Sequence, residues 1–360
     1  MKGIMNNKIT IFSGLLMASV GLASGTACAS GSSVVLYGIL DTSIEYLTNA
    51  GGTSSTPHSV LRETSGSWYS DRVGLKGTED LGNGYAAIFT LESGFNIGNG
   101  ALLQGGRLFG RQAFVGLDTP FGAVTFGRQK TVLYDYLLGL DPLSWSSYGL
   151  DDQDTQVVNR ADNSVKYVTN IGPFNFDAMY SFGYDSVSGS GPLPGQFRVG
   201  KEYDIGGEYA SGPATLAIIF EQRNGNSSGT GNQKEQRFVA AGSYAFSQMK
   251  FFGGYEWYMS SVIATAQHQN MFYAGAQYRV TVPLQLSAAI FYHDIRSADQ
   301  RPVSFGVQAD YALSKQTQLY IEGTYVKNSN GSDLGASGFG SSIVAGRNQT
   351  AVAAGIVHMF

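Results

Sequence analysis

Residues 72–95 constrain the fold more than any other stretch of this chain, because two segments there alternate strictly between polar and apolar side chains. In the first segment one face holds Arg72, Gly74, Lys76 and Thr78. After the Gly-containing turn at residues 81–84, Tyr85, Ala87, Phe89 and Leu91 share one face and Ala86, Ile88, Thr90 and Glu92 share the other. A period of two residues is that of a β-strand. A hairpin with one apolar face and one partly charged face predicts the wall of a barrel in lipid with a wet interior.

The N-terminus predicts an export signal. Lys2 and Lys8 flank the start of an apolar run that ends at Ala23, and residues 27–29 (Ala-Cys-Ala) have the small-x-small pattern of a cleavage site. We therefore expect a signal peptide at 1–29 and a mature barrel at 30–360. The run of about 15 residues is too short to span a membrane as a helix. Cys28, the only cysteine, precedes the predicted cut, so the mature chain has no disulfide. An alternative use of Cys28 as a lipidated N-terminus requires an aliphatic residue where Gly25 stands.

The composition excludes several classes of protein. Charged residues make up 14% of the 360 residues, against about 25% in ordinary soluble domains. No segment of the mature chain has 18 consecutive apolar residues, which argues against a transmembrane helix. Without Lys2 and Lys8, 21 basic and 27 acidic residues remain, and this net charge of −6 does not suggest a nucleic-acid partner. A membrane barrel or an unusual secreted β protein remains, and 48 Gly, 21 Tyr and 21 Phe suit strands, turns and aromatic girdles.

The connections between strands predict the architecture. We expect sixteen strands, at 34–46, 68–79, 85–95, 108–117, 123–129, 163–169, 174–184, 198–210, 214–222, 235–246, 250–259, 269–280, 284–295, 302–312, 317–327 and 348–360. Connections after odd strands are long and polar, as at 48–67, 185–197 and 328–347, whereas those after even strands are short. Alternation of long and short connections is typical of outer-membrane barrels, whose short turns face the periplasm. The predicted fold class is all-β, a transmembrane 16-stranded antiparallel β-barrel.

Several motifs resemble one family. Residues 72–84 (RVGLKGTEDLGNG), 109–117 (FGRQAFVGL), 121–122 (FG) with 127–129 (GRQ), the start VLYG at 35–38 and the end HMF at 358–360 are similar to the general porins of Gram-negative outer membranes, betaproteobacterial branch. The resemblance covers the whole mature chain. It implies a homotrimer of diffusion channels for small hydrophilic solutes and ions, with both termini periplasmic. It also implies contact with outer-membrane lipid and lipopolysaccharide, and recognition of Phe360 by the barrel-assembly machinery.

The resemblance also implies that the third external loop folds inward and narrows the channel. Here that loop is residues 130–162, whose apolar stretch 134–145 includes a possible helical turn before Pro142. Packing against the inner wall accounts for its apolar residues, and the alternative is a loop folded over the barrel mouth. Loops of this length are uncommon unless they are functional or disordered.

Constriction residues follow from the same resemblance. The basic wall is formed by Arg72, Arg111 and Arg160, with Lys76 and Arg128 as further candidates. The acidic loop position is Asp141, and Asp135, Asp151, Asp152 and Asp154 are further candidates. The acidic Pro-Glu-Phe-Gly-Gly stretch of the enterobacterial branch is absent, and each arginine has the alternative of being an ordinary lumen-facing charge. Opposed charges across a narrow aqueous gap produce a transverse field that favours polar solutes.

Signatures of other functions are scarce. There is no Gly-x-Ser-x-Gly elbow or phosphate-binding loop, and a lipase-like barrel has only His293 as a conceivable base, so we expect no enzyme and no cofactor. The acidic run 151–154 does not have calcium-loop spacing, and we predict no metal site. Two alternatives remain: a substrate-specific porin of the same fold, with Trp145 and Tyr148 in a solute track, and a plugged surface barrel acting as an adhesin or structural protein. Ala351, Ala353 and Ala354 are predicted to pack against a neighbouring barrel. The sequence leaves anion or cation preference open.

Overall fold

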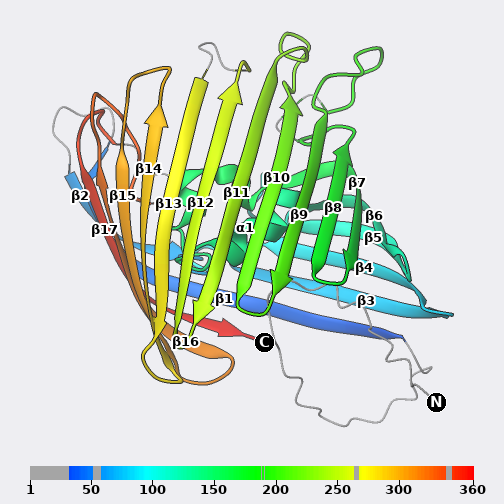
Figure 1. Ribbon diagram of the computed structural model, residues 1–360, viewed down its shortest axis with the longest axis horizontal. Coiled ribbons are helices and arrows are strands. Elements are labelled where there is room, and N and C mark those ends of the chain that lie inside the picture. Colours follow the sequence, from blue (N-terminus) through cyan, green and yellow to red (C-terminus); the bar gives the residue numbers. More distant parts are fainter. Residues whose placement is uncertain (1–31, 52–57, 188, 190, 263–266, 338–342) are drawn as a thin grey trace.

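The computed structural model describes residues 32–51, 58–187, 189, 191–262, 267–337 and 343–360. The predicted signal peptide at 1–29 lies outside the described residues. The strands are β1 (Ser33–Ala50), β2 (His58–Ser65), β3 (Arg72–Gly82), β4 (Tyr85–Gly94), β5 (Gln112–Thr119), β6 (Gly122–Lys130), β7 (Arg160–Ile171), β8 (Phe174–Ser181), β9 (Glu202–Ser211), β10 (Ala214–Asn224), β11 (Lys234–Phe246), β12 (Met249–Ser260), β13 (Gln267–Arg279), β14 (Leu284–Ile295), β15 (Val303–Ala312), β16 (Thr317–Lys327) and β17 (Gln349–Met359). Figure 1 shows them surrounding a few short helices.

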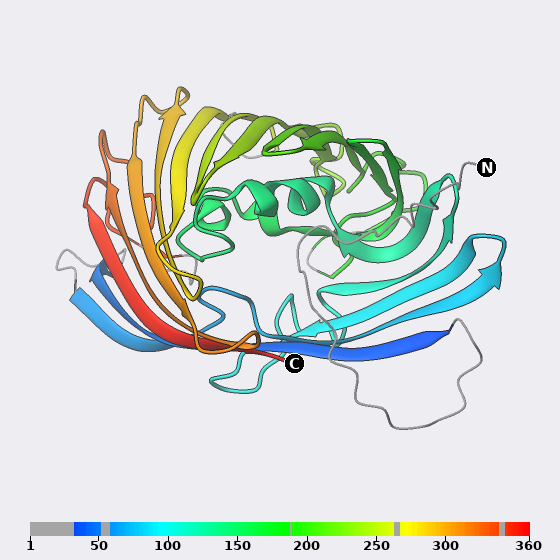
Figure 2. The ribbon, with the colours of Figure 1, turned by 60° about the horizontal axis from the view of Figure 1, so that its bottom comes forward.

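The strands close into one antiparallel barrel (Figure 2). Strand β1 pairs on one side with β17, and on the other side first with β3 and then with β2. Strands β2 and β3 therefore occupy one strand position of the barrel, one after the other. The seventeen strands of the described residues thus form the predicted sixteen-stranded barrel. Closure leaves no sheet edge whose backbone groups would face lipid unpaired.

The break between β2 and β3 differs from the predicted strand at 68–79 and from the predicted loop at 48–67. Gly66 has φ of 74°, which turns the backbone out of the strand. The Asp41 carboxylate then accepts hydrogen bonds from the amides of Trp68 (2.7 Å) and Tyr69 (2.5 Å). A side chain of β1 thus replaces the strand pairing that is missing between β2 and β3.

The hairpin of β3 and β4 has the predicted faces. Val73 and Leu75 lie on the exposed outer surface, and Arg72 and Gly74 face inward and are buried. Asn83 (φ 54°) and Gly84 (φ 82°) form the turn, as a tight hairpin with two left-handed central residues requires. On β12 and β16, Phe251, Leu319 and Ile321 are likewise exposed, as predicted for lipid-facing residues.

The last strand corrects one prediction. Ala351 and Ala353 are buried on the inner face of β17, and only Ala354 of the three predicted contact residues lies on the outer face. Ala351 and Ala353 are opposite Leu47 and Glu45 of β1, which also point inward. Because both faces of this strand are apolar or small, its residue pattern did not reveal which face is inward.

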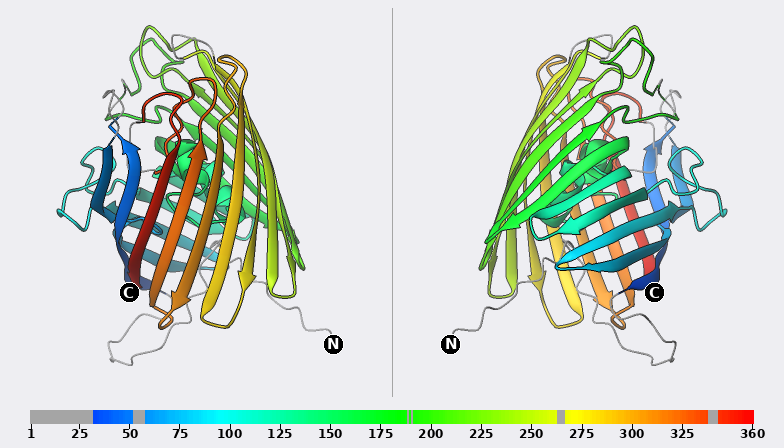
Figure 3. Two further views of the ribbon diagram at one scale, coloured as in Figure 1. Left: turned by 90° about the vertical axis from the view of Figure 1, so that its left-hand side faces the viewer. Right: turned by 90° about the vertical axis from the view of Figure 1, so that its right-hand side faces the viewer.

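Short and long connections alternate as predicted. The turns at 83–84, 120–121, 172–173, 212–213, 247–248, 280–283 and 313–316 lie at one rim. The connections at 95–111 and 131–159, and the described parts of those at 182–201 and 328–348, begin and end at the other rim. Figure 3 shows the C-terminus at the rim of the short turns. Among the described residues, no helix is long and apolar enough to cross a membrane.

The connection between β6 and β7 lies inside the barrel. It contains α1 (Val132–Leu137), η1 (Leu138–Leu140), α2 (Leu150–Gln153) and η2 (Thr155–Val158). Figure 2 shows these helices against the inner wall, at the side of the green and yellow strands. Leu133, Leu137 and Leu140 are buried there in one cluster with residues of the wall, including Ile219 and Phe291. Burial of these side chains, roughly 1.5–3 kcal/mol each, accounts for the inward fold of the loop.

Candidate pore constriction

Four cationic side chains gather beside Tyr134 and Trp145 of the inward loop. Arg72 begins β3, Arg111 immediately precedes β5, Lys130 ends β6 and Arg160 begins β7. The Tyr134 hydroxyl on α1 accepts hydrogen bonds from Arg111 Nη2 (3.2 Å) and Arg160 Nη2 (3.4 Å). Lys130 Nζ lies 4.6 Å from the centre of the Tyr134 ring. We call Arg72, Arg111, Lys130 and Arg160 the basic cluster.

Trp145, at the middle of the loop, contacts the same group of side chains. The Arg72 guanidinium lies 6.0 Å from the centre of the Trp145 ring, and the Tyr134 and Trp145 rings meet edge to face at 5.7 Å. Arg72 Nε also donates to the Ser70 carbonyl at 2.9 Å. The two aromatic rings thus hold the loop close to Arg72, Arg111 and Arg160.

One carboxylate, that of Glu92, accompanies the basic cluster. Arg111 Nε donates to Glu92 Oε1 at 2.7 Å, and the Tyr37 hydroxyl donates to Glu92 Oε2 at 2.8 Å. Glu92 is opposite Gly74 in the β3–β4 hairpin, so it shares the inner face with Arg72. The residue pattern predicts Glu92 on the charged face of the hairpin, but Glu92 is not among the predicted constriction residues. Four positive charges against one negative charge leave a positive excess at this point of the wall.

The two further basic candidates lie apart from the cluster. Lys76 faces inward on β3, with its Nζ 5.5 Å from the centre of the Tyr37 ring. Arg128 forms an ion pair with Asp162 (2.6 Å) and donates to the Gly110 carbonyl. Asp162 also pairs with Arg107 at 3.1 Å, and Arg107 pairs in turn with Asp185 at 2.9 Å, so two carboxylates balance these two arginines.

Asp141 is turned into its own loop. Its side chain is buried and accepts hydrogen bonds from the amides of Leu143 (3.0 Å) and Trp145 (3.2 Å). Burial raises the pKa of Asp141 to about 6, although these amide bonds oppose the shift. Among the described residues Asp141 forms no ion pair, so its observed contacts fix the turn after Pro142.

The other acidic candidates lie at several places along the loop: Asp135 on α1, Asp151 and Asp152 on α2, and Asp154 between α2 and η2. Asp135 pairs with Lys166, and Asp154 pairs with Arg237 at 2.6 Å. Burial raises the pKa of both Asp151 and Asp152 well above the ordinary value, and nearby carboxylates add to the shift. The structure thus gathers three predicted arginines at one place but brings none of the five predicted acids into an ion pair with them.

The middle of the loop is hydrogen-bonded to the wall near the place where the first strand, β1, pairs with the last strand, β17. Glu322 of β16 accepts hydrogen bonds from Ser146 (2.5 Å) and from Ser67 in the β2–β3 break (2.7 Å). The Tyr148 hydroxyl donates to Glu45 of β1 at 2.9 Å, and Tyr148 is fully buried.

His293, the only base considered for a lipase-like site, lies inside the barrel. Its ring nitrogens contact the side chains of Gln269 (2.8 Å) and Gln153 (3.0 Å). A catalytic pair on the lipid-facing wall is therefore not formed with this residue.

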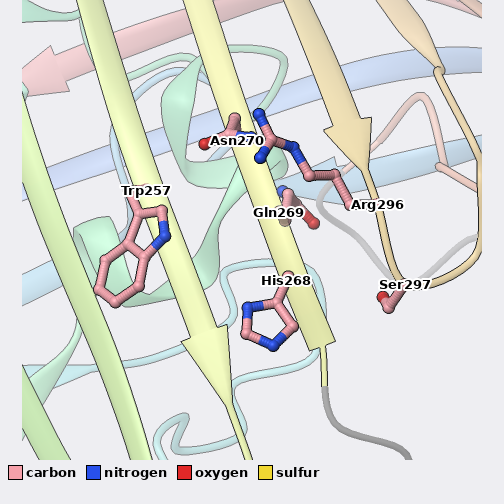
Figure 4. Close-up of a pocket in the computed structure, with 6 residues that line it drawn as sticks. All are labelled: Trp257, His268, Gln269, Asn270, Arg296 and Ser297. Carbon is pink, nitrogen blue, oxygen red and sulfur yellow. The ribbon is translucent and has the colours of Figure 1, made fainter.

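A separate pocket lies outside the lumen. Figure 4 shows Trp257 of β12, His268 and Asn270 of β13, and Arg296 of the β14–β15 connection around it. Asn270 is opposite Trp257 in the register, on the outer face of the barrel. Among the described residues, none that lines this pocket belongs to the basic cluster.

A closed antiparallel barrel with an apolar exterior and an inward loop defines an outer-membrane channel. Residues 15–331 match the sequence profile of the Gram-negative porin family, and the chain belongs to this family. It is 31% identical to outer membrane porin protein 32 of Delftia acidovorans and 29% identical to an outer membrane porin protein of Bordetella pertussis, in both cases over 96% of this chain and 99% of the relative. The fold is similar to that of an anion-selective porin from Comamonas acidovorans, with a TM-score of 0.79, 26% identity, and coverage of 91% of this chain and 100% of that chain.

The family and the fold together establish the general function. The protein is a multi-pass β-barrel of the Gram-negative outer membrane and a passive diffusion channel. Its short turns accordingly face the periplasm.

Proposed function

We propose that the basic cluster makes this channel prefer anions among the small hydrophilic solutes and ions that it passes. The observation that carries the proposal is the convergence of Arg111, Lys130 and Arg160 on Tyr134 and of Arg72 on the adjoining Trp145 ring. Among the described residues, Glu92 is the only carboxylate that forms an ion pair with them. An excess of positive charge beside a narrow aqueous passage raises the local concentration of anions.

The surroundings of the cluster strengthen its field. Arg72, Arg111 and Arg160 are all buried, with the apolar loop on one side and the strands on the other. Low-dielectric walls focus the field of such charges into the water-filled gap. The similar Comamonas protein is named as anion-selective, which supports the same preference here.

The acidic half of the proposed transverse field differs from the sequence hypothesis. Asp135 and Asp154 are compensated by Lys166 and Arg237, and Asp141 accepts amides of its own loop. We propose that the field arises mainly from the positive excess of the basic cluster and falls across the passage away from it, because burial favours the neutral forms of Asp151 and Asp152. Polar solutes gain from alignment in such a field, whereas apolar solutes lose ordered water without compensation.

We further propose that the protein forms a homotrimer, as the family resemblance implies, with outer-membrane lipid and lipopolysaccharide around it. The exposed apolar outer face of β16, β17 and β1, including Ile321, Ala354 and Ile44, is available for contact with lipid or a neighbouring barrel. Phe360 is exposed at the periplasmic rim, where the barrel-assembly machinery can reach it. No catalytic activity is expected from this arrangement.

Planar-bilayer recording tests these proposals. We expect large ohmic conductance in steps of three, and a reversal potential in a KCl gradient whose sign reports chloride preference. A cation-preferring reversal potential would refute the role of the basic cluster. Block by one particular solute would favour the substrate-specific alternative, for which Trp145 remains accessible but the fully buried Tyr148 does not. Silent, correctly folded protein would favour the plugged barrel.

A further inference from the structure

Three carboxylates from two adjacent strands crowd together on the inner wall. Glu202 and Asp204 are on β9 and Glu221 is on β10. In the register Asp204 lies directly opposite Glu221, and all three side chains are buried. Each can offer one oxygen such that the oxygens are within 4.8 Å of one another. Like charges directly opposite each other on a sheet are destabilising unless something neutralises them.

Several of these oxygens lack a hydrogen-bond donor. Among the described residues, both carboxylate oxygens of Glu202, Oδ1 of Asp204 and Oε2 of Glu221 are buried without one. Leaving a buried charged acceptor without a donor is costly, because the group has lost its water and gains no partner in exchange. Native proteins rarely tolerate several such atoms in one place, so they point to a bound cation or proton.

The neighbouring arginines are already engaged by other carboxylates. Arg237 pairs with Asp154 (2.6 Å), Glu235 (2.6 Å) and Oε1 of Glu221 (3.0 Å). Arg223 stacks on the Tyr184 ring, 4.0 Å from its centre, and its Nη1 is 3.9 Å from Glu235. Neither arginine forms an ion pair with Glu202 or Asp204 in the described part of the chain. Two arginines therefore do not balance this group of carboxylates.

The donor set favours calcium over magnesium. Calcium takes six to eight oxygen ligands in flexible geometry, and protein carboxylates commonly supply several of them. Magnesium demands near-ideal octahedral geometry and dehydrates reluctantly, so it is rarely held by a dedicated cage of protein carboxylates. Carboxylates on two strands with water completing the shell suit the flexible geometry of calcium.

We propose that Glu202, Asp204 and Glu221 bind one Ca²⁺ ion on the inner wall of the barrel, beside the start of the constriction loop. The Val132 amide of α1 donates to Oδ2 of Asp204 at 3.3 Å. Val132 also packs on Gly206 of β9, where an added Cβ would lie 2.6 Å from Val132 Cγ1. The ion thus neutralises the wall at the point where α1 is attached, and it stabilises the position of the loop.

Calorimetric titration of refolded, lipopolysaccharide-free mature protein with CaCl₂ at neutral pH, after removal of metal with EDTA, tests the site. We expect one saturable Ca²⁺ per chain, and binding weakened at least about tenfold in Glu202→Gln/Asp204→Asn. The matched control is Glu79→Gln/Asp80→Asn, which makes the same change of charge at exposed positions near the periplasmic turn and keeps wild-type binding. The single variant Glu202→Gln replaces the double if the double does not fold.

Three results would overturn the proposal. The first is no saturable binding to the wild-type protein, which would mean that protons neutralise these carboxyl groups. The second is equal binding by the Glu202 variants and the wild type. The third, equal affinity for MgCl₂, would refute the assignment to calcium. None of these outcomes depends on anion preference, which the bilayer recordings measure separately.

Discussion

Replacing Arg72 and Arg160 with glutamine removes two positive charges from the basic cluster without breaking an ion pair. Neither guanidinium pairs with a carboxylate among the described residues, since Glu92 is bound by Arg111. Their hydrogen bonds go to the Ser70 and Val158 carbonyls and to Tyr134, which are groups that a glutamine amide can also serve. The variant therefore tests charge more than packing.

The expected effect follows from Coulomb's law. For an ion passing roughly 8 Å from each charge in water, two charges contribute about 1 kcal/mol, and screening at 0.1 M salt reduces this to about 0.5 kcal/mol. Anion occupancy then falls about twofold and cation occupancy rises about twofold. The ratio of chloride to potassium permeability should fall roughly fourfold to fivefold.

Reversal potentials in a KCl gradient measure this ratio directly. The matched control is Arg296→Gln/Arg301→Gln, which removes the same charge from the exposed β14–β15 connection and should leave the ratio within about 1.5-fold of wild type. A similarly small change in Arg72→Gln/Arg160→Gln, with intact trimers and wild-type conductance, would refute the assignment of the basic cluster to ion preference. Repeating the measurement at 1 M salt should shrink the difference, because the Debye length falls to about 3 Å.

Three further perturbations test other parts of the site. Burial raises the pKa of Tyr134, but the charges of Lys130, Arg111 and Arg160 outweigh burial and lower the pKa to about 8. Ionisation of Tyr134 adds a negative charge, so chloride preference should fall between pH 7 and 9. A Tyr134→Phe channel whose chloride preference falls over the same pH range would contradict this assignment. Gly206→Ala places a Cβ 2.6 Å from Val132 and should push α1 into the lumen and lower single-channel conductance, whereas Gly207→Ala, with its nearest contact at 3.4 Å, should not; equal conductances in the two variants would speak against α1 as a boundary of the passage. Glu322→Ala leaves the hydroxyls of Ser67 and Ser146 without their acceptor and should lower the free energy of unfolding by about 1–3 kcal/mol, measured by thermal denaturation in detergent, and an unchanged midpoint would show that this anchor is weak.

The barrel was predictable because its signals are local and repeated. A period of two residues reports which face a strand buries, and the alternating connection lengths report which rim it starts from. The break at residues 66–71 was not predictable in this way. Its amides are satisfied by Asp41, a residue of another strand, and no pattern within 58–79 carries that information.

The constriction was predictable only in part, for a related reason. Arg72 and Glu92 could be assigned to one face from the hairpin register alone. The position of Tyr134 depends on the irregular path of residues 131–159, which has no periodicity to follow. The partners of the acidic loop residues could not be predicted either, because the spacing of residues 151–154 does not indicate that Asp154 pairs with Arg237 of β11. The group of Glu202, Asp204 and Glu221 was missed because its ligands come from two strands without a contiguous motif.

The attachment of the loop to Glu322 has a consequence for the order of assembly. Glu322 is on the penultimate strand, and the partner of Tyr148, Glu45, is on the first strand. The inward loop itself is made much earlier in the chain than β16. We therefore expect the middle of the loop to reach its final position only when the last strands have joined β1, and a partly built barrel to have a wider passage than the finished one. The constriction therefore reaches its final width in the same step in which β17 pairs with β1 and closes the barrel.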